Sequence, residues 1–178
     1  MGFLWPLALI LSFSPDLLGK PSTKFNRNTI VLSEEIYLGK PLGSYFEYFM
    51  NHGGDATIDE VTSGEFDDQF KVSSSASLGF GFNTDPIWLR CTIKNPGEEV
   101  AKFFLEVGYS HLDQIALYIP TTEGHYSVRN AGDKKPFRDR EVNHHNFIFK
   151  LSQAPGTATY YIRIQTSSSL SILLASLR

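Results

Sequence analysis

Residues 87–94 have the sequence IWLRCTIK, in which the character of the side chain alternates from one residue to the next. Successive side chains of a β-strand point to opposite faces, so the alternation separates two faces. One face is apolar and the other carries an indole, a guanidinium and a hydroxyl: Ile87, Leu89, Cys91 and Ile93 against Trp88, Arg90 and Thr92. The stretch predicts a strand with one core face and one face that offers an aromatic ring beside an arginine.

The same period recurs along the chain after Ser77. Short alternating segments are separated by turn residues, at the spacing typical of a sandwich or a barrel. The predicted strands are 78–82, 87–94, 101–109, 114–119, 126–130, 146–151, 159–165 and 170–175, with an earlier one at 29–36. No helix-length pattern interrupts the later strands, so we expect them to pair antiparallel in an all-β domain.

Two segments before Ser77 carry helical signals. Leu42 to Met50 has apolar residues at helical spacing. Thr57-Ile58-Asp59-Glu60 has the Thr-x-x-Glu form of a capping box. We therefore expect one or two short helices at the periphery of the fold.

The bulk composition describes an ordinary globular domain. A chain of 178 residues is long enough for one domain with a real core. Hydrophobic residues make up 42% and charged residues 20%, which excludes a disordered chain. The net charge of −3 gives no electrostatic footprint for nucleic acid, so we expect no nucleic-acid partner. Cys91 is the single cysteine, which rules out an internal disulfide.

The N-terminal segment differs from the rest of the chain. Phe3 to Phe13 is a short apolar run, followed by the small residue Gly19, which is typical of a secretory signal. The run is too short for a membrane-spanning helix, which needs about 20 apolar residues. The chain thus divides into a predicted signal peptide at 1–19, a polar connector at 20–29 and a folded domain at 30–178.

Several short motifs in a fixed order point to a family. They are LGFGF at 78–82, IWLR at 87–90, NP at 95–96, LDQIALY at 112–118, HNFIF at 145–149 and YYIRIQ at 160–165. Together they resemble the second type of extracellular domain of the seven-transmembrane receptors with diverse intracellular signalling modules. The resemblance implies a jelly-roll β-sandwich similar to carbohydrate-binding modules. It also implies a place in the bacterial periplasm or on the outer face of the cytoplasmic membrane, coupled to seven helices and a cytoplasmic output domain.

The candidate ligand-binding residues combine aromatic rings with planar polar groups. A sugar ring binds flat aromatic side chains and a carboxylate binds a guanidinium fork. Trp88 with Arg90, and Tyr161 with Arg163, supply an aromatic ring and a guanidinium on the face of each strand that is opposite the core face. A polar loop before residue 146 adds further candidates. The complete set is Trp88, Arg90, Tyr118, Arg140, His145, Asn146, Tyr161 and Arg163. The alternative is that these arginines pair with Glu106 or Asp113 and only solubilise an exposed sheet.

Catalytic and metal-binding patterns are missing from the sequence. It contains no Gly-x-Ser-x-Gly elbow, no His-Glu-x-x-His and no phosphate-binding glycine loop. The adjacent His144 and His145 would point to opposite faces of a strand, and no further ligand has metal-site spacing. We expect no enzyme activity, no cofactor and no metal.

These observations favour an exported sensor domain that recognises a carbohydrate or another small polar or acidic ligand. Through the receptor helices, such a domain would be attached to the membrane. The alternative is a free-standing exported β-sandwich for protein interaction or polysaccharide binding. The sequence leaves open whether this chain is a piece of a receptor or stands alone.

Overall fold

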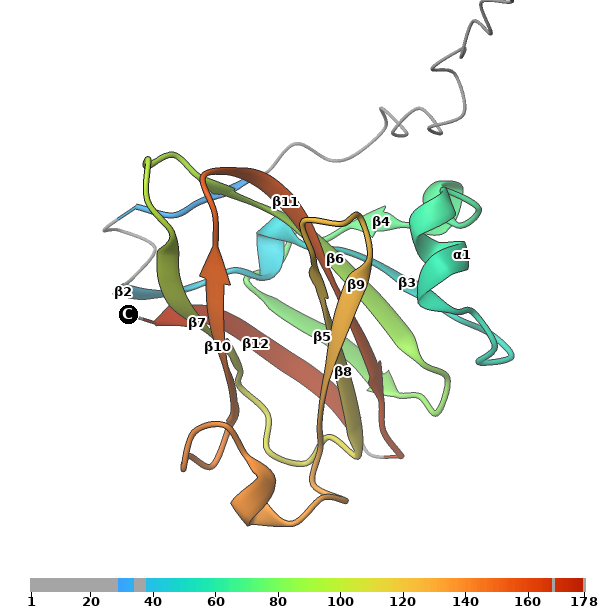
Figure 1. Cartoon of the computed structure of the whole chain (residues 1–178). Coiled ribbons are helices and arrows are strands. Elements are labelled where there is room, and N and C mark those ends of the chain that lie inside the picture. The colour runs from blue at the N-terminus through green and yellow to red at the C-terminus, as the bar shows by residue number, and fades with distance from the viewer. Residues whose placement is uncertain (1–28, 34–37, 168, 178) are drawn as a thin grey trace, which may run out of the picture.

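The computed structural model describes residues 29–33, 38–167 and 169–177, which form two packed β-sheets with a short α-helix outside them (Figure 1). The predicted signal peptide and the predicted connector up to residue 28 lie outside the described residues. The all-β jelly-roll sandwich is confirmed. The division of the chain into signal peptide, connector and domain stays a prediction.

The larger sheet has seven strands and carries the candidate site. Its order is β4-β3-β6-β11-β8-β9, and β1 pairs with β6 in the same sheet. The pairing of β1 with β6 is parallel, whereas the other described strand pairs of both sheets are antiparallel, as predicted. The strands are β1 (Ile30–Val31), β3 (Glu47–Met50), β4 (Lys71–Val72), β6 (Ile87–Asn95), β8 (Gln114–Pro120), β9 (Tyr126–Ala131) and β11 (Gly156–Gln165).

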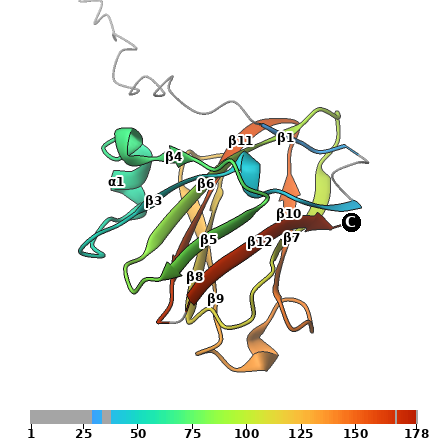
Figure 2. The same ribbon diagram turned by 180° about the vertical axis from the view of Figure 1, so that it is seen from behind.

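The smaller sheet has five strands in the order β10-β7-β12-β2, with β5 also paired to β12. Strand β12 pairs with β5 along its first half and with β7 and β2 along its second half. From behind, β5 and β12 lie side by side, as this register requires (Figure 2). The strands are β2 (Leu38–Pro41), β5 (Ser77–Phe82), β7 (Ala101–Val107), β10 (Phe147–Gln153) and β12 (Ser169–Leu177).

The main core lies between the two sheets and confirms the predicted core face of β6. Its members on β6, β7 and β10 share an exposed fraction of 4% or less. They are Ile87, Leu89, Cys91, Ile93, Phe103, Leu105, Val107, Phe147, Phe149 and Leu151. They occupy alternate positions on each strand, because strand side chains alternate between the two faces. Burial of this apolar surface is the main stabilising contribution to the sandwich.

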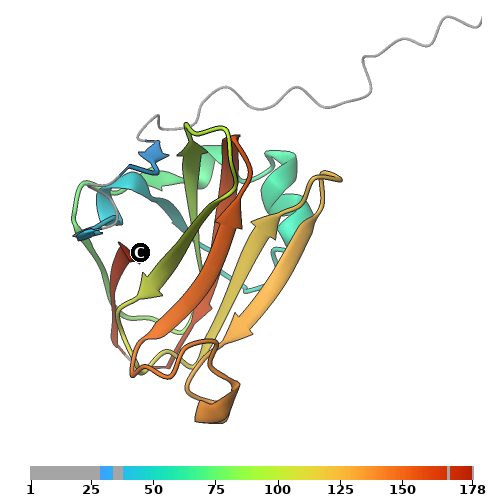
Figure 3. The ribbon, with the colours of Figure 1, turned by 60° about the vertical axis from the view of Figure 1, so that its left-hand side comes forward.

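A second, smaller core lies on the outer face of the larger sheet. It is closed by a segment that we call the cover, residues 56–70, which contains α1 (Ile58–Ser63) and the 3₁₀ turn η2 (Asp67–Gln69). The cover packs Ala56 and Val61 against the outer face of the sheet. Figure 3 shows α1 outside the sandwich. Strand β6 is therefore buried on both faces.

The predicted helix at residues 42–50 is wrong. A single 3₁₀ turn, η1 (Gly43–Tyr45), is followed by strand β3. Phe46 belongs to the main core and Phe49 to the second core. A strand that is buried on both faces loses its polar alternation, so its apolar spacing cannot be told from that of a helix. Pairing with β6 makes this segment a strand.

The predicted capping box is confirmed and starts α1. Thr57 is the N-cap: its backbone N–H donates to Glu60 Oε2 at 2.8 Å, and the Glu60 N–H donates to Thr57 Oγ1 at 3.4 Å. The helix ends at Gly64, whose φ of 94° is the left-handed conformation that favours glycine. The helix is short and peripheral, as expected. A further 3₁₀ turn, η3 (Phe137–Asp139), lies in the polar loop before β10.

The buried thiol of Cys91 reports on the integrity of the main core. It is 3% exposed, and burial raises the pKa of the thiol far above its usual value. Because the thiolate is the reactive form, we expect the native protein to resist an aromatic disulfide reagent at pH 8. The protein unfolded in guanidinium chloride should release one equivalent per chain, since the chain has one cysteine. Rapid stoichiometric labelling of the native protein would contradict this packing.

Candidate ligand-binding site

The structure divides the eight predicted site residues into three groups. Trp88, Arg90 and Tyr161 lie beneath the cover, with exposed fractions of 0%, 3% and 3%. The Trp88 ring stacks on Tyr118, with ring centroids 5.3 Å apart, and its indole N–H has no partner among the described residues. The prediction that these three side chains form an open recognition face is wrong, because the cover occupies that face.

Arg90 holds the cover to the sheet. Its Nε donates to Glu47 Oε2 on β3, and its Nη1 donates to Asp67 Oδ1 in the cover. The guanidinium carbon lies 3.8 Å from the centre of the Phe70 ring. The alternative that Arg90 pairs with Glu106 or Asp113 at an exposed sheet is therefore also wrong. Burial also raises the pKa of the neighbouring Tyr161 hydroxyl, which keeps this side chain neutral.

The second group lies in the loop before β10 and makes contacts within the protein. Arg140 Nη1 donates to the carbonyl oxygens of His144 and His145. Its guanidinium carbon lies 4.4 Å from the centre of the Phe147 ring. Asn146 Nδ2 donates to Glu106 Oε1 on β7 at 2.6 Å. These bonds order the loop, and Arg140, His145 and Asn146 do not line the hollow that holds the third group.

The third group, Tyr118 and Arg163, lines a hollow on the outer face of the larger sheet, next to the cover. The hollow has a volume of about 340 Å³. Its floor is set by strand register: Arg163 of β11 is opposite Ala116 of β8, which is opposite Asn130 of β9. Directly opposite side chains on neighbouring strands are close together. Because alanine has only a methyl group, a depression forms between Arg163 and Asn130.

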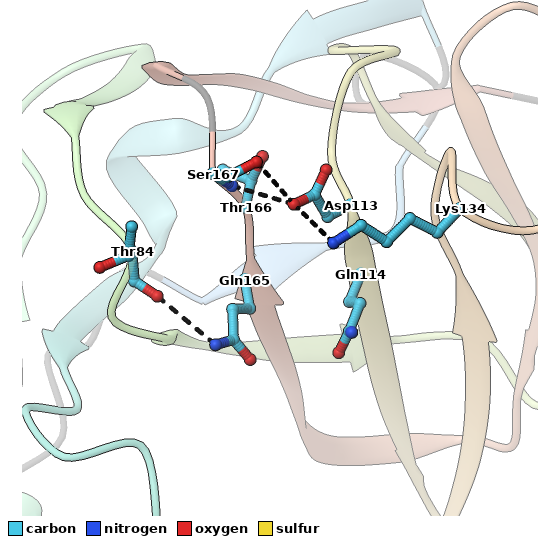
Figure 4. Close-up of a pocket in the computed structure, with 7 residues that line it drawn as sticks. All are labelled: Thr84, Asp113, Gln114, Lys134, Gln165, Thr166 and Ser167. Atoms are coloured by element: carbon cyan, nitrogen blue, oxygen red, sulfur yellow. Dashed lines mark hydrogen bonds and ion pairs between the residues drawn. The ribbon is translucent and has the colours of Figure 1, made fainter.

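A second hollow of about 190 Å³ adjoins the first and shares Asp113, Gln114 and Lys134 with it. Gln114 and Gln165 are directly opposite each other on β8 and β11. Figure 4 shows that their side chains project in the same direction between Thr84 and Lys134. The two hollows together form one polar surface, which we call the outer trough.

Arg163 is half-buried in the trough and has no carboxylate partner among the described residues. Its Nη2 donates to the carbonyl oxygen of Gly54 at 3.4 Å and to Gln165 Oε1 at 3.3 Å. Within the described part of the chain, its Nε and Nη1 make no hydrogen bond. Burial raises the pKa of Tyr118, and the positive charge of Arg163 partly opposes that shift. The guanidinium is thus placed to donate hydrogen bonds to an external anion or to a hydroxyl oxygen.

The carboxylate of Asp113 is already occupied. Lys134 Nζ and the Ser167 N–H and Oγ all bond Asp113 Oδ2 at 3.0 Å (Figure 4). The bond from Lys134 and the bonds from Ser167 hold the pKa of Asp113 below its usual value. Gly132 makes this arrangement possible: its φ is 142°, and a Cβ there would lie 2.2 Å from the Asp113 carbonyl oxygen. The turn brings Lys134 and Lys135 to the trough.

Several trough residues were not among the predicted site residues. Gln114 and Gln165 could have been found from strand alternation, because each lies on the same predicted face as Tyr118 or Arg163. Asn130 needs the register of β8 with β9. Lys134 and Lys135 come from a turn, where no periodic signal assigns a side chain to a face.

The fold and the trough define a β-sandwich of the jelly-roll class with a polar surface on one outer sheet face. The chain belongs to the family of extracellular domains described as 7TMR-DISM extracellular 2, whose model matches residues 43–176. This match confirms the resemblance seen in the sequence and makes the chain an extracellular domain of the seven-transmembrane receptor type.

The chain was also compared with curated proteins and with solved structures. No curated protein matches the chain. A solved structure described as an X-ray crystal structure of a non-crystalline cellulose specific carbohydrate-binding module, CBM28, is similar at 12% identity. That similarity covers 61% of this chain and 70% of the other, with a TM-score of 0.24. Among the described residues, no helix has the length and apolar character needed to cross a bilayer.

Replacing Arg90 with methionine tests how the cover is held. The change leaves the buried carboxylate of Glu47 and the partly buried carboxylate of Asp67 without the Arg90 cation, so we expect the free energy of unfolding to fall by about 3–5 kcal/mol. Arg138→Met is the matched control, because the Arg138 side chain is 86% exposed, and its effect should stay within about 0.5 kcal/mol. Guanidinium denaturation measures both. Equal stability of the two variants would contradict the role of Arg90.

Proposed function

We propose that this chain is the ligand-binding sensor domain of a seven-transmembrane signalling receptor and binds a small polar ligand in the outer trough. The ligand is a carbohydrate or a small acid. The observation that carries the proposal is the half-buried guanidinium of Arg163, which faces the trough with Nε and Nη1 unbonded among the described residues.

The contrast with the other predicted arginines supports this assignment. The Arg90 guanidinium is neutralised by two carboxylates, and the Arg140 guanidinium lies against the Phe137 and Phe147 rings with its Nη1 bonded to backbone carbonyl oxygens. A charged group that is partly removed from water without an oppositely charged partner is costly, and a ligand oxygen would offset that cost. Arg163 therefore has both the position and the unused hydrogen-bonding capacity of a ligand contact.

The same reasoning gives the domain a sensory and non-catalytic role. Asp113 is the one carboxylate among the described residues that line the trough. It is tied to Lys134 and Ser167 and has a lowered pKa, so it is a poor general acid. We propose export by the signal peptide at residues 1–19 and a position in the periplasm or on the outer face of the membrane. Binding would shift the population of receptor states that differ in ligand affinity. Family membership supports this receptor context over the free-standing alternative.

A thermal-shift screen of neutral sugars and organic acids tests the proposal. At least one compound should raise the Tm saturably, with a stabilisation of about 2.7 kcal/mol at a concentration of 100 Kd. We expect Arg163→Gln to lose most of that shift, because the guanidinium donors are gone. Arg138→Gln, at an exposed arginine outside the trough, should retain it. An equal shift in the wild-type protein and the Arg163→Gln variant would overturn the proposal.

A further inference from the structure

The charges that line the outer trough are unbalanced. Among the described residues, the first hollow is lined by three cationic side chains, Lys134, Lys135 and Arg163, and by a single carboxylate, that of Asp113. That carboxylate already neutralises Lys134. The whole chain carries a net charge of −3, so the positive excess belongs to this surface and not to the composition. A concave surface of one sign attracts ligands of the opposite sign, which favours an anion here.

Planar amides accompany these cations. Gln114 projects from β8 and Asn130 from β9; both are exposed, and neither side chain makes a hydrogen bond with another described residue. Gln165 is half-buried, and its Nε2 donates to the Thr84 carbonyl oxygen at 3.4 Å (Figure 4). An amide offers both a donor and an acceptor, which matches the dual character of a hydroxyl group. A simple carboxylic acid without hydroxyls would leave these groups unused.

The dimensions of the floor limit the size of the ligand. Neighbouring strands lie about 4.8 Å apart, so Arg163 and Asn130, which flank Ala116, are separated by about 10 Å across the sheet. Along β8, Gln114 and Tyr118 lie two residues to either side of Ala116, which is about 13 Å from one to the other. The hollow volume of about 340 Å³ is at the small end of ligand sites. This space fits one sugar ring.

Tyr118 supplies an apolar contact beside this floor. Its ring is half-buried and is held against Trp88, which is itself fully buried. An aromatic ring in a fixed orientation can contact the C–H groups of a sugar without losing further conformational entropy. The trough thus combines a cation, amides and an aromatic surface within the area of one ring.

We infer that the ligand of the outer trough is a monomeric sugar acid of the uronate type. Its carboxylate binds Arg163, and its hydroxyls bond the amides of Gln114, Gln165 and Asn130. Lys135, whose Nζ donates to the Asn130 carbonyl oxygen at 3.2 Å, adds positive charge on the β9 side of the trough. This assignment rests on the proposed function, because it specifies the ligand class of the same site.

Four compounds of similar size test separately whether the site requires a carboxylate and whether it requires hydroxyl groups. D-galacturonate and D-glucuronate carry a ring, hydroxyls and a carboxylate; D-galactose lacks the carboxylate, and cyclohexanecarboxylate lacks the hydroxyls. Isothermal titration calorimetry of the wild-type domain at low salt should give a uronate Kd at least about tenfold lower than those of the other two compounds. That ratio corresponds to about 1.4 kcal/mol. Raising the salt concentration should weaken uronate binding and leave galactose binding unchanged.

Two variants assign the preferences to residues. Arg163→Gln should remove the preference for uronate over galactose. Gln114→Leu should remove much of the preference for uronate over cyclohexanecarboxylate, because it deletes a hydroxyl contact and leaves the cation in place. Both side chains are at the surface of the trough, and circular dichroism with a Tm measurement checks that each variant is folded. The expected result is two separate losses of discrimination.

The outcomes distinguish a wrong ligand class from a wrong binding site. If galactose or cyclohexanecarboxylate binds as tightly as the uronates, the sugar-acid assignment is overturned, although loss of that binding in Arg163→Gln would leave the proposed function standing. If none of the four compounds binds while another compound of the screen binds through Arg163, the sugar-acid assignment is again overturned and the proposed function again stands. If the Kd of every bound compound is unchanged in Arg163→Gln, the proposed function fails together with the assignment.

Discussion

The pairing of β6 with β11 is the constraint on which the rest of the structure depends. The two strands are in register from Ile87 opposite Ile164 to Asn95 opposite Gly156, in the middle of the larger sheet. One face of this pair contributes to the main core and the other to the second core beneath the cover. Because both faces are dry beneath the cover, a polar group there needs a partner within the protein, which Arg90 finds in Glu47 and Asp67.

The limit of the cover decides which part of the outer sheet face is open to solvent. Arg90 and Arg163 occupy the same face of adjacent strands, two positions apart in the register, because Arg90 is opposite Tyr161. Arg90 lies beneath the cover, whereas Arg163 lies at the start of the uncovered area formed by β8 and β9. Two arginines that look equivalent in the sequence therefore differ in role: one holds the cover and the other is available in the trough.

The trough is also tied to its surroundings by specific bonds. Arg163 contacts the Gly54 carbonyl oxygen just before the cover, and Asp113 joins the turn after β9 to the end of β11 through Lys134 and Ser167. A ligand on Arg163 or Lys134 would thus act on groups that already hold three segments together. Such shared contacts are the physical basis on which a binding domain can favour one receptor state over another.

Much of the fold was predictable from local pattern. The alternation at residues 87–94 predicted the inner face of β6, Thr57 and Glu60 predicted the start of α1, and the ordered motifs predicted the family. Alternation also predicted that Arg90 and Arg163 share a face. It could not predict which of them is covered, because what packs against a face comes from residues distant in the chain. For the same reason residues 42–50 resembled a helix, and the lysines of the turn after β9 gave no signal. By itself the sequence determined the side chains that share a face; only the tertiary structure decided, through long-range contacts, which of them meet solvent.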